Sequence, residues 1–311
     1  MSGALISACK KGLSIKNMRS ECNESMGPTA RLIAVPPGAF WQKSDMTDFT
    51  TYVNERLHDT KAARWYAFFG PDVPIRRITN NKEADVTFTA DDGTQIFIRY
   101  GVLNRAFGTT EGGLCFAEAL MSLNKSGYSF IEIDNASQVM VRKNTDGTYS
   151  ALKSTFVYSP SPDLADFKNP AFTNFSYSIK PEEYVRNGVI FQADDDSLLD
   201  LLSLADTDVA DATGSTTTKL KIGVVTECGQ TDLVALLGAT LAQVTNFVVT
   251  KVSDGTHPSV TAAAVVSGHI ELTGTFVSAA GYTVALAAPS VLLTNGVQGY
   301  EGIVAVTITI P

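Results

Sequence analysis

The segment that most clearly sets the fold is Val86-Thr-Phe-Thr-Ala-Asp-Asp-Gly-Thr-Gln-Ile-Phe-Ile-Arg-Tyr100. Apolar and polar residues alternate from Val86 to Thr89 and again from Gln95 to Tyr100, which is the period-two pattern of a β-strand. Asp91-Asp92-Gly93 lies between the two runs and is typical of a tight turn, because glycine adopts positive φ without steric cost. The segment therefore predicts a β-hairpin.

The residues around this hairpin predict a mixed N-terminal domain. Phe49, Val53 and Leu57 recur at helical spacing after the capping pair Ser44-Asp45. A second helix is expected after Thr109-Thr110-Glu111, with Phe116, Leu120 and Leu123 on one face, and a short third one from Ser197 to Leu204. Alternating runs predict strands at Tyr128–Ile133, Val139–Lys143, Tyr149–Tyr158 and Thr173–Ile179. We expect a mostly antiparallel sheet with packed helices, an α+β or mainly β fold.

The composition changes sharply near residue 215. Only eight charged residues occur among the last 97, and the last arginine is Arg186. Between the two halves runs a polar, aperiodic segment of small residues, 205–218, which reads as a linker. The chain is therefore expected to contain an N-terminal domain (1–204), this linker and a C-terminal domain (219–311).

The C-terminal half is rich in Val, Ile and Thr in short runs between Gly, Ser and Asn turns. Six or seven short strands in about 95 residues predict an immunoglobulin-like (Ig-like) β-sandwich without the Cys…Trp…Cys hallmark. In the last run, alternation predicts that Val304 shares a buried face with Val306, Ile308 and Ile310. The strands are expected at Lys219–Thr226, Asn246–Val252, Val260–Val266, His269–Phe276, Tyr282–Ala287 and Gly302–Ile310, with a helix at Asp232–Leu241.

Charge and cysteine content exclude several function classes. The 311 residues carry a formal net charge of −8, which disfavours a role in gripping nucleic-acid phosphates. No run approaches the length of a membrane-spanning helix. The four cysteines, at positions 9, 22, 115 and 228, are too scattered for a zinc site and are expected to be free thiols. Ile6-Ser-Ala-Cys9 looks like a lipoprotein cleavage site, but it lacks the basic residues and apolar length of a signal peptide.

The residues that could carry chemistry have structural interpretations that fit them better. Asp194-Asp195-Asp196 with Asp200 lacks the spacing of a calcium loop and suits a helix N-terminus. Glu182-Glu183 follows Pro181 as a first helical turn does. His58 is expected on the solvated face of a helix, without the elbow motif of a serine hydrolase. Gly108–Gly113 lacks the lysine of a phosphate loop. We therefore predict no catalytic, cofactor-binding or metal-binding residues, and no cofactor.

The order of the parts resembles the major tail tube proteins of tailed bacteriophages: a tube-forming domain of about two hundred residues, a polar linker and an Ig-like appendage. The passage from Ser129-Phe-Ile-Glu-Ile-Asp-Asn135 to Thr145-Asp-Gly147 also resembles virion proteins of phages that infect Bacteroidetes-type hosts. The resemblance implies a structural protein of the virion that is assembled in the host bacterial cytoplasm. It implies hexameric rings stacked around a DNA channel, contacts with other virion proteins, and no membrane partner.

The residues themselves also allow self-assembly. The strands Val86–Thr89 and Gln95–Tyr100 are suited to extend a neighbour's sheet, and the segment Met1–Arg31 is expected to dock as an arm on an adjacent subunit. The alternatives are another virion component (head decoration, fibre or ring protein) and a glycan-binding surface adhesin. A hydrolase that uses paired carboxylates such as Asp91/Asp92 is a third alternative, although adjacent acids on a strand point to opposite faces.

Overall fold

The computed structural model describes residues 26–71, 73–123, 127–158, 170–193 and 196–311. They form two compact units, and the chain passes from one to the other between Leu201 and Leu202. The N-terminal unit ends at Leu201, and the C-terminal unit also includes the short segment His58–Thr60. The fold is mostly β, with several antiparallel sheets and few helices.

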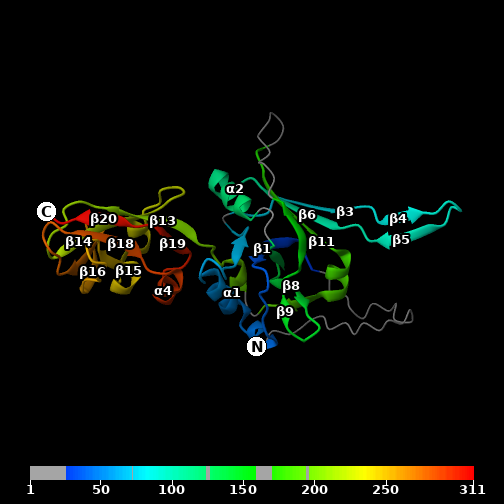
Figure 1. Ribbon diagram of the computed structural model, residues 1–311, viewed down its shortest axis with the longest axis horizontal. Helices are drawn as coiled ribbons and strands as arrows, with labels where there is room; N and C mark the ends of the chain where they lie inside the picture. Colours follow the sequence, from blue (N-terminus) through cyan, green and yellow to red (C-terminus); the bar gives the residue numbers. More distant parts are fainter. Residues whose placement is uncertain (1–25, 72, 124–126, 159–169, 194–195) are drawn as a thin grey trace. The chain divides into compact units, whose positions relative to one another are not determined.

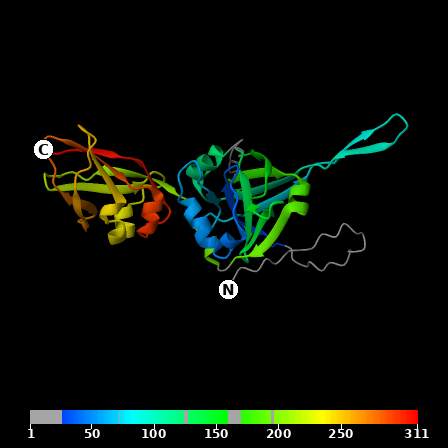
Figure 2. The same ribbon diagram turned by 60° about the horizontal axis from the view of Figure 1, so that its bottom comes forward.

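Two sheets form the body of the N-terminal unit (Figures 1 and 2). The first has the order β12-β8-β7-β1-β2, with β9 also pairing with β8, and the second has the order β10-β11-β6-β3. The strands of the first are β1 (Thr29–Val35), β2 (Tyr66–Phe68), β7 (Ser129–Asp134), β8 (Gln138–Lys143), β9 (Tyr149–Ser150) and β12 (Gly188–Gln192). Those of the second are β3 (Arg77–Lys82), β6 (Leu103–Thr109), β10 (Ser154–Tyr158) and β11 (Thr173–Ile179).

Strand β1 explains the layering of this unit. Ile33 and Val35 pack with α1 (Phe49–Leu57), whereas Leu32 and Ala34 pack with the second sheet and α2 (Gly113–Ser122). A strand that is covered on both faces reads as a continuous apolar run and not as an alternating one. The segment Met1–Arg31 was expected to dock as an arm on an adjacent subunit, but its last residues, Thr29–Arg31, begin β1 and pair with β7 of the same chain. Residues 1–25 lie outside the described residues.

The C-terminal unit contains two further sheets that enclose one core. Their strand orders are β16-β17-β14-β13-β19 and β15-β18-β20. Alternate residues point inward, as in Leu220, Ile222 and Val224 of β14. The strands are β13 (Ala205–Asp211), β14 (Lys219–Thr226), β15 (Phe247–Lys251), β16 (Val260–Val266), β17 (His269–Gly274), β18 (Gly281–Leu286), β19 (Tyr300–Val304) and β20 (Val306–Thr309).

Two expectations for this half are corrected. The predicted linker 205–218 begins with strand β13, which pairs with β14 and β19. In this strand Thr207 and Val209 are buried, but the surrounding residues are small and polar, so the sequence shows no clear alternation there. The predicted last strand is divided at Ala305, and its two parts pair in different sheets. Val304 is therefore half exposed, whereas Ile308 and Ile310 are buried as expected.

The helices are short. Helix α1 buries Phe49, Val53 and Leu57, as the spacing predicts, and α3 (Leu233–Leu237) is capped by Asp232. The helix expected over Ser197–Leu204 is only a 3-10 turn, Asp196–Leu199. Helix α4 (Pro289–Thr294) was not predicted. None of the helices in the described ranges has the length and apolar character needed to cross a membrane.

Candidate functional site

The most unusual surface of the N-terminal unit is the two-stranded sheet of β4 (Val86–Thr89) and β5 (Gln95–Arg99), hereafter the hairpin arm. It continues the β3–β6 ladder and projects away from the two larger sheets (Figures 1 and 2, cyan). The predicted turn closes it: Ala90 N–H donates to Thr94 O at 2.8 Å, and Gly93 has φ +84°. The predicted β-hairpin is thus confirmed.

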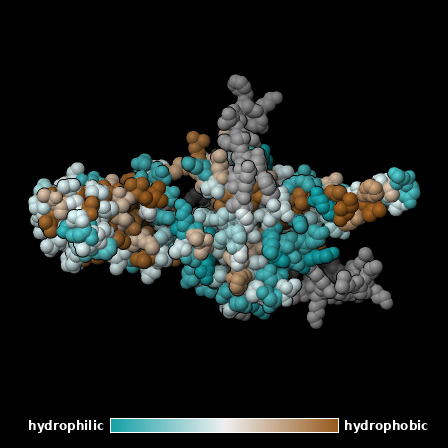
Figure 3. Space-filling model, viewed as in Figure 1, coloured by the Kyte–Doolittle hydropathy of each residue, from teal (hydrophilic) through white to brown (hydrophobic). Residues whose placement is uncertain are grey.

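The hairpin arm exposes large apolar side chains on both faces. Phe88 lies opposite Ile96, and Phe97 lies opposite Thr87 on the other face. Hydrophobic residues follow the arm in Figure 3. Exposed clusters of large apolar side chains are uncommon on soluble monomers and are a feature of many interaction surfaces. The exposed fractions are 55% for Phe88, 51% for Ile96, 50% for Phe97, 58% for Ile98 and 44% for Tyr100.

Polar contacts hold the base of the arm. Asp85 accepts hydrogen bonds from the Gly101 backbone N–H at 2.9 Å and pairs with Lys82 at 2.7 Å. Lys82 and the Gly101 N–H lower the pKa of the Asp85 carboxyl from its usual value. The backbones approach so closely here that a Cβ on Gly101 would lie 2.0 Å from Glu83 O. Position 101 therefore requires glycine.

A buried polar network anchors the strand that leads back from the arm. Glu132 on β7 is 1% exposed, and Arg105 of β6 pairs with it at 2.5 Å. Thr29 donates to the same carboxylate at 2.8 Å, and the Tyr177 hydroxyl donates to its other oxygen. Burial and the Glu132 charge raise the pKa of Tyr177 well above its usual value. The network connects the two sheets, because β7 lies in one and β6 and β11 lie in the other.

A cavity of about 520 Å³ lies beside this network. Polar and apolar side chains both line it. Its lining residues are Met26, Gly27, Pro28, Thr29, Ile78, Asn80, Arg105, Glu132 and Tyr184. Burial raises the pKa of Tyr184 above its usual value, and the negative charge of Glu132 raises it further.

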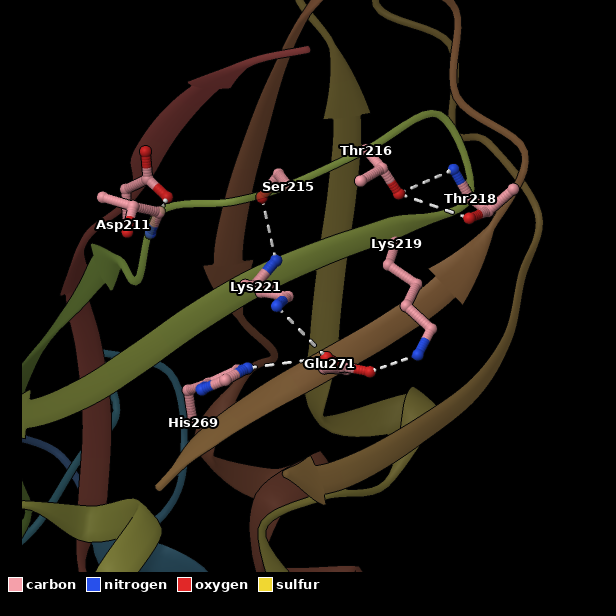
Figure 4. Close-up of polar contacts among 9 residues, drawn as sticks. Asp211, Ser215, Thr216, Thr218, Lys219, Lys221, His269 and Glu271 are labelled. Carbon is pink, nitrogen blue, oxygen red and sulfur yellow. Dashed lines mark hydrogen bonds and ion pairs between the residues drawn. The ribbon is translucent and has the colours of Figure 1, made fainter. Parts of the chain in front are cut away.

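The C-terminal unit has a second carboxylate with several partners. Figure 4 shows Lys219 and Lys221 of β14 and His269 of β17 converging on Glu271. The distances from the Glu271 carboxylate are 2.5 Å to Lys219, 3.5 Å to Lys221 and 3.6 Å to His269. The hydrogen bond from Lys219 lowers the pKa of Glu271. Glu271 is opposite Ala264 of the edge strand β16, so this cluster lies directly behind that edge.

The residues considered for chemistry do not converge. Asp91 and Asp92 lie in the exposed turn of the hairpin arm, where Asp92 accepts from Thr94 N–H at 2.9 Å. Glu183 pairs with Arg142 at 3.1 Å. Gly112 and Gly113 both have positive φ at the start of α2, so they allow the chain to turn tightly into this helix. Asp194 and Asp195 lie outside the described residues, and within the described ranges no three His, Cys, Asp or Glu side chains are grouped to hold a metal ion.

Two expectations about single residues are wrong. His58 is 1% exposed, and its Nε2 accepts a hydrogen bond from Gly299 N–H at 3.1 Å; its partner is 241 residues away, so helical spacing could not reveal it. Cys115 and Cys228 are each disulfide-bonded and are not free thiols, because separation in sequence does not limit proximity in a fold. Cys9 and Cys22 lie outside the described residues.

Sequence reasoning did not single out Arg105, Glu132 or Tyr177. The only signal was a charged residue inside each of two strands, at Glu132 between isoleucines and at Arg105 in β6. No protein-family model matches the chain, and a comparison with curated proteins finds no significant match. Any functional conclusion therefore depends on the surfaces described above.

Proposed function

We propose that the chain is a non-enzymatic structural subunit that assembles with copies of itself through the hairpin arm. The observation that carries this proposal is the exposure of four large apolar side chains on a two-stranded sheet and of Tyr100 directly after it. Such a sheet is marginally stable in water by itself. Because these side chains are only about half exposed, covering each of them against a neighbour would contribute part of the about 1.5–3 kcal/mol that complete burial gives. The arm is therefore suited to be covered in an assembly.

The kind of assembly that we propose is a tail tube of a tailed bacteriophage, built in the host cytoplasm from stacked, hexameric rings. The support is the layout of the chain: an N-terminal unit built mainly of β-sheets with a projecting hairpin, followed by a second β-rich unit. A head-to-tail contact between an arm and a different surface of the next copy would generate closed rings or stacks. The net charge of −8 is compatible with a channel through which DNA slides.

We also propose that the C-terminal unit is an Ig-like domain. In the constant-type Ig fold, one sheet has strands D-E-B-A and the other has C-F-G. With β13 as strand A, the order β16-β17-β14-β13 corresponds to D-E-B-A, and β15-β18-β20 corresponds to C-F-G. Strand β19 would be the first part of strand G, paired in parallel with strand A. This correspondence supports the Ig-like assignment although the Cys…Trp…Cys hallmark is missing.

The test is assembly of the full-length protein, measured by light scattering and negative-stain electron microscopy. Rings or tubes are expected. The double variant Phe97→Asp/Ile98→Asp places a charge on each face of the arm and should yield monomers or small oligomers with an unchanged circular dichroism spectrum. Phe40→Asp is the matched control, because Phe40 is 64% exposed and lies outside the arm.

Two results would contradict this function. Wild-type protein that stays monomeric at high concentration would exclude assembly as an intrinsic property. Rings that survive the double variant would exclude the arm as the contact. A saturable signal on a glycan array from such a monomer would favour the adhesin alternative, and discs or fibres in place of tubes would favour another virion component.

A further inference from the structure

Strand β16 leaves one edge of the five-stranded sheet open. It stands at the end of the order β16-β17-β14-β13-β19, and among the described residues its second edge has no paired strand. Six of its seven residues are Val or Ala. Val265 and Val266 are 40% and 37% exposed. A long, apolar, open edge of this kind is a template for another strand.

This edge lacks the usual protection against pairing. Between Gly255 and Ile270 the chain contains no Asp, Glu, Lys or Arg, and no proline lies within β16. The edge strand β3, by contrast, carries Arg77 and Lys82. The only irregularity of β16 is a register shift between Val260 and Ala262, which leaves Ala262–Val266 as a regular stretch. Natural sheets use edge charges, prolines or bulges to prevent pairing, and this stretch has none of them.

The occupant that fits best is a second copy of the same strand. In an antiparallel pair centred on Ala264, Ala263 would lie opposite Val265 of the other copy, and Ala262 opposite Val266. Every cross-strand pair would then join small or β-branched apolar side chains, and no like charges would meet. The charged cluster one strand behind the edge keeps its ionic contacts within one copy, because Lys219 and Lys221 both pair with Glu271.

We propose that β16 is a second self-association surface, which pairs in antiparallel fashion with β16 of another copy about a two-fold axis. This inference does not depend on the hairpin arm. A two-fold contact joins only two chains, so it could not propagate by itself. It would link two subunits, or two assemblies that are themselves held together by the hairpin arm. Five paired residues bury little area, so the contact is weak in isolation and becomes populated where copies are concentrated.

The experiment uses the full-length chain carrying Phe97→Asp/Ile98→Asp, so that the arm does not contribute. Sedimentation velocity over a concentration series should reveal a monomer–dimer equilibrium. Adding Val265→Lys should weaken the dimer by roughly tenfold or more, because each lysine then lies opposite Ala263 of the other copy and the two lysines are diagonal neighbours, about 7–8 Å apart on one face of the sheet. Val248→Lys on β15 is the matched control: Val248 is 42% exposed, close to the 40% of Val265, and should leave the equilibrium unchanged.

A cross-linking measurement locates the contact. Ala264→Cys should form a disulfide-linked dimer on mild oxidation, above the background that the native cysteines give in the parent protein. A parent protein that is monomeric at every concentration, or a dimer that Val265→Lys does not weaken, would overturn the proposal. Because the arm is already disabled in this background, either result would leave the proposed function of the arm untouched.

Discussion

The hairpin arm and the β16 edge offer different parts of the chain to a partner. The arm presents large aromatic and branched side chains on a sheet of two strands, whereas β16 presents backbone groups beside alanines and valines on a sheet of five strands. A carboxylate stands behind each surface: Glu132 behind the strand β6 that leads from the arm, and Glu271 behind β16.

The two carboxylates differ in what they stabilise. Glu132 is enclosed by Arg105, Thr29 and Tyr177 and connects two sheets. Glu271 lies between neighbouring strands of one sheet, and its nearest partner, Lys219, has a side chain that is 47% exposed. The strand that leads from the apolar arm is thus held by a buried network, whereas the open edge lies beside an ion cluster whose main cation, Lys219, is half exposed. This difference predicts that replacing the carboxylate by alanine destabilises the N-terminal unit more than the C-terminal unit.

The largest effect is expected from Glu132→Ala. The substitution leaves the Arg105 guanidinium without its carboxylate, and removing one partner of a buried pair costs about 3–5 kcal/mol. Urea unfolding followed by tryptophan fluorescence measures the stability of the N-terminal unit selectively. Trp41 and Trp65 are the only two tryptophans, and both are buried in that unit.

Glu271→Ala is the control for that prediction. Lys219 has a side chain that is 47% exposed and can be solvated after the substitution, so the C-terminal unit should lose less stability than the N-terminal unit loses in Glu132→Ala. The tryptophan transition should not move, because this cluster lies in the other unit. Equal losses at the two positions would show that the Glu132 network is no more than a surface ion pair.

A smaller effect is expected from Gly101→Val at the base of the arm. A Cβ there would lie 2.0 Å from Glu83 O, so the backbone must separate. Overpacking of this kind costs about 1–3 kcal/mol, and the cost should be local to the arm. Trypsin cleavage after Lys82 and Arg99 should accelerate by roughly tenfold or more. The tryptophan transition should change little, since Gly101 belongs to neither apolar core of the N-terminal unit.

Gly223→Ala is the matched control in the sheet that contains β16. A Cβ on Gly223 of β14 would meet nothing within 4 Å. Its proteolysis and stability should therefore match those of the wild type. Unchanged cleavage of Gly101→Val would indicate that the base of the arm accommodates a side chain, and the arm would then have to be held by other contacts.

Local patterns in the sequence predicted several elements well. The predicted ranges Thr173–Ile179, Lys219–Thr226 and Val260–Val266 coincide with β11, β14 and β16, because alternation or an uninterrupted β-branched run is a local signal. The hairpin arm was predicted for the same reason. The extent to which its side chains are exposed was not, because exposure depends on which neighbours the rest of the chain supplies.

Other features are set by contacts between distant residues. Strand β1 is apolar on both sides because two layers cover it, which removes the alternation that identifies a strand. Glu132 is 27 residues from Arg105 and 103 from Thr29. No spacing rule connects such positions, so the network behind the arm could not be assembled from the sequence.

The smallest effect is expected from pH at the base of the arm. Lys82 and the Gly101 N–H hold the pKa of Asp85 below its usual value. The carboxylate's contribution to the stability of the arm is therefore complete above the pKa of an unfolded Asp, about 3.9. It is lost as the pH falls through the lower pKa of Asp85 in the folded protein. The Gly101 amide, followed by NMR, should titrate in that window, and high salt should narrow it because the Lys82 pair is exposed.

Asp85→Asn separates charge from hydrogen bonding in this titration. The amide oxygen can still accept from Gly101 N–H, but it carries no charge for Lys82 and does not titrate. The acid transition of the Gly101 amide should therefore disappear while the neutral-pH spectrum of the arm is retained. A transition that persists in Asp85→Asn would assign it to another carboxylate, and the Asp85 contacts with Lys82 and the Gly101 N–H would then not be the pH-sensitive part of the base.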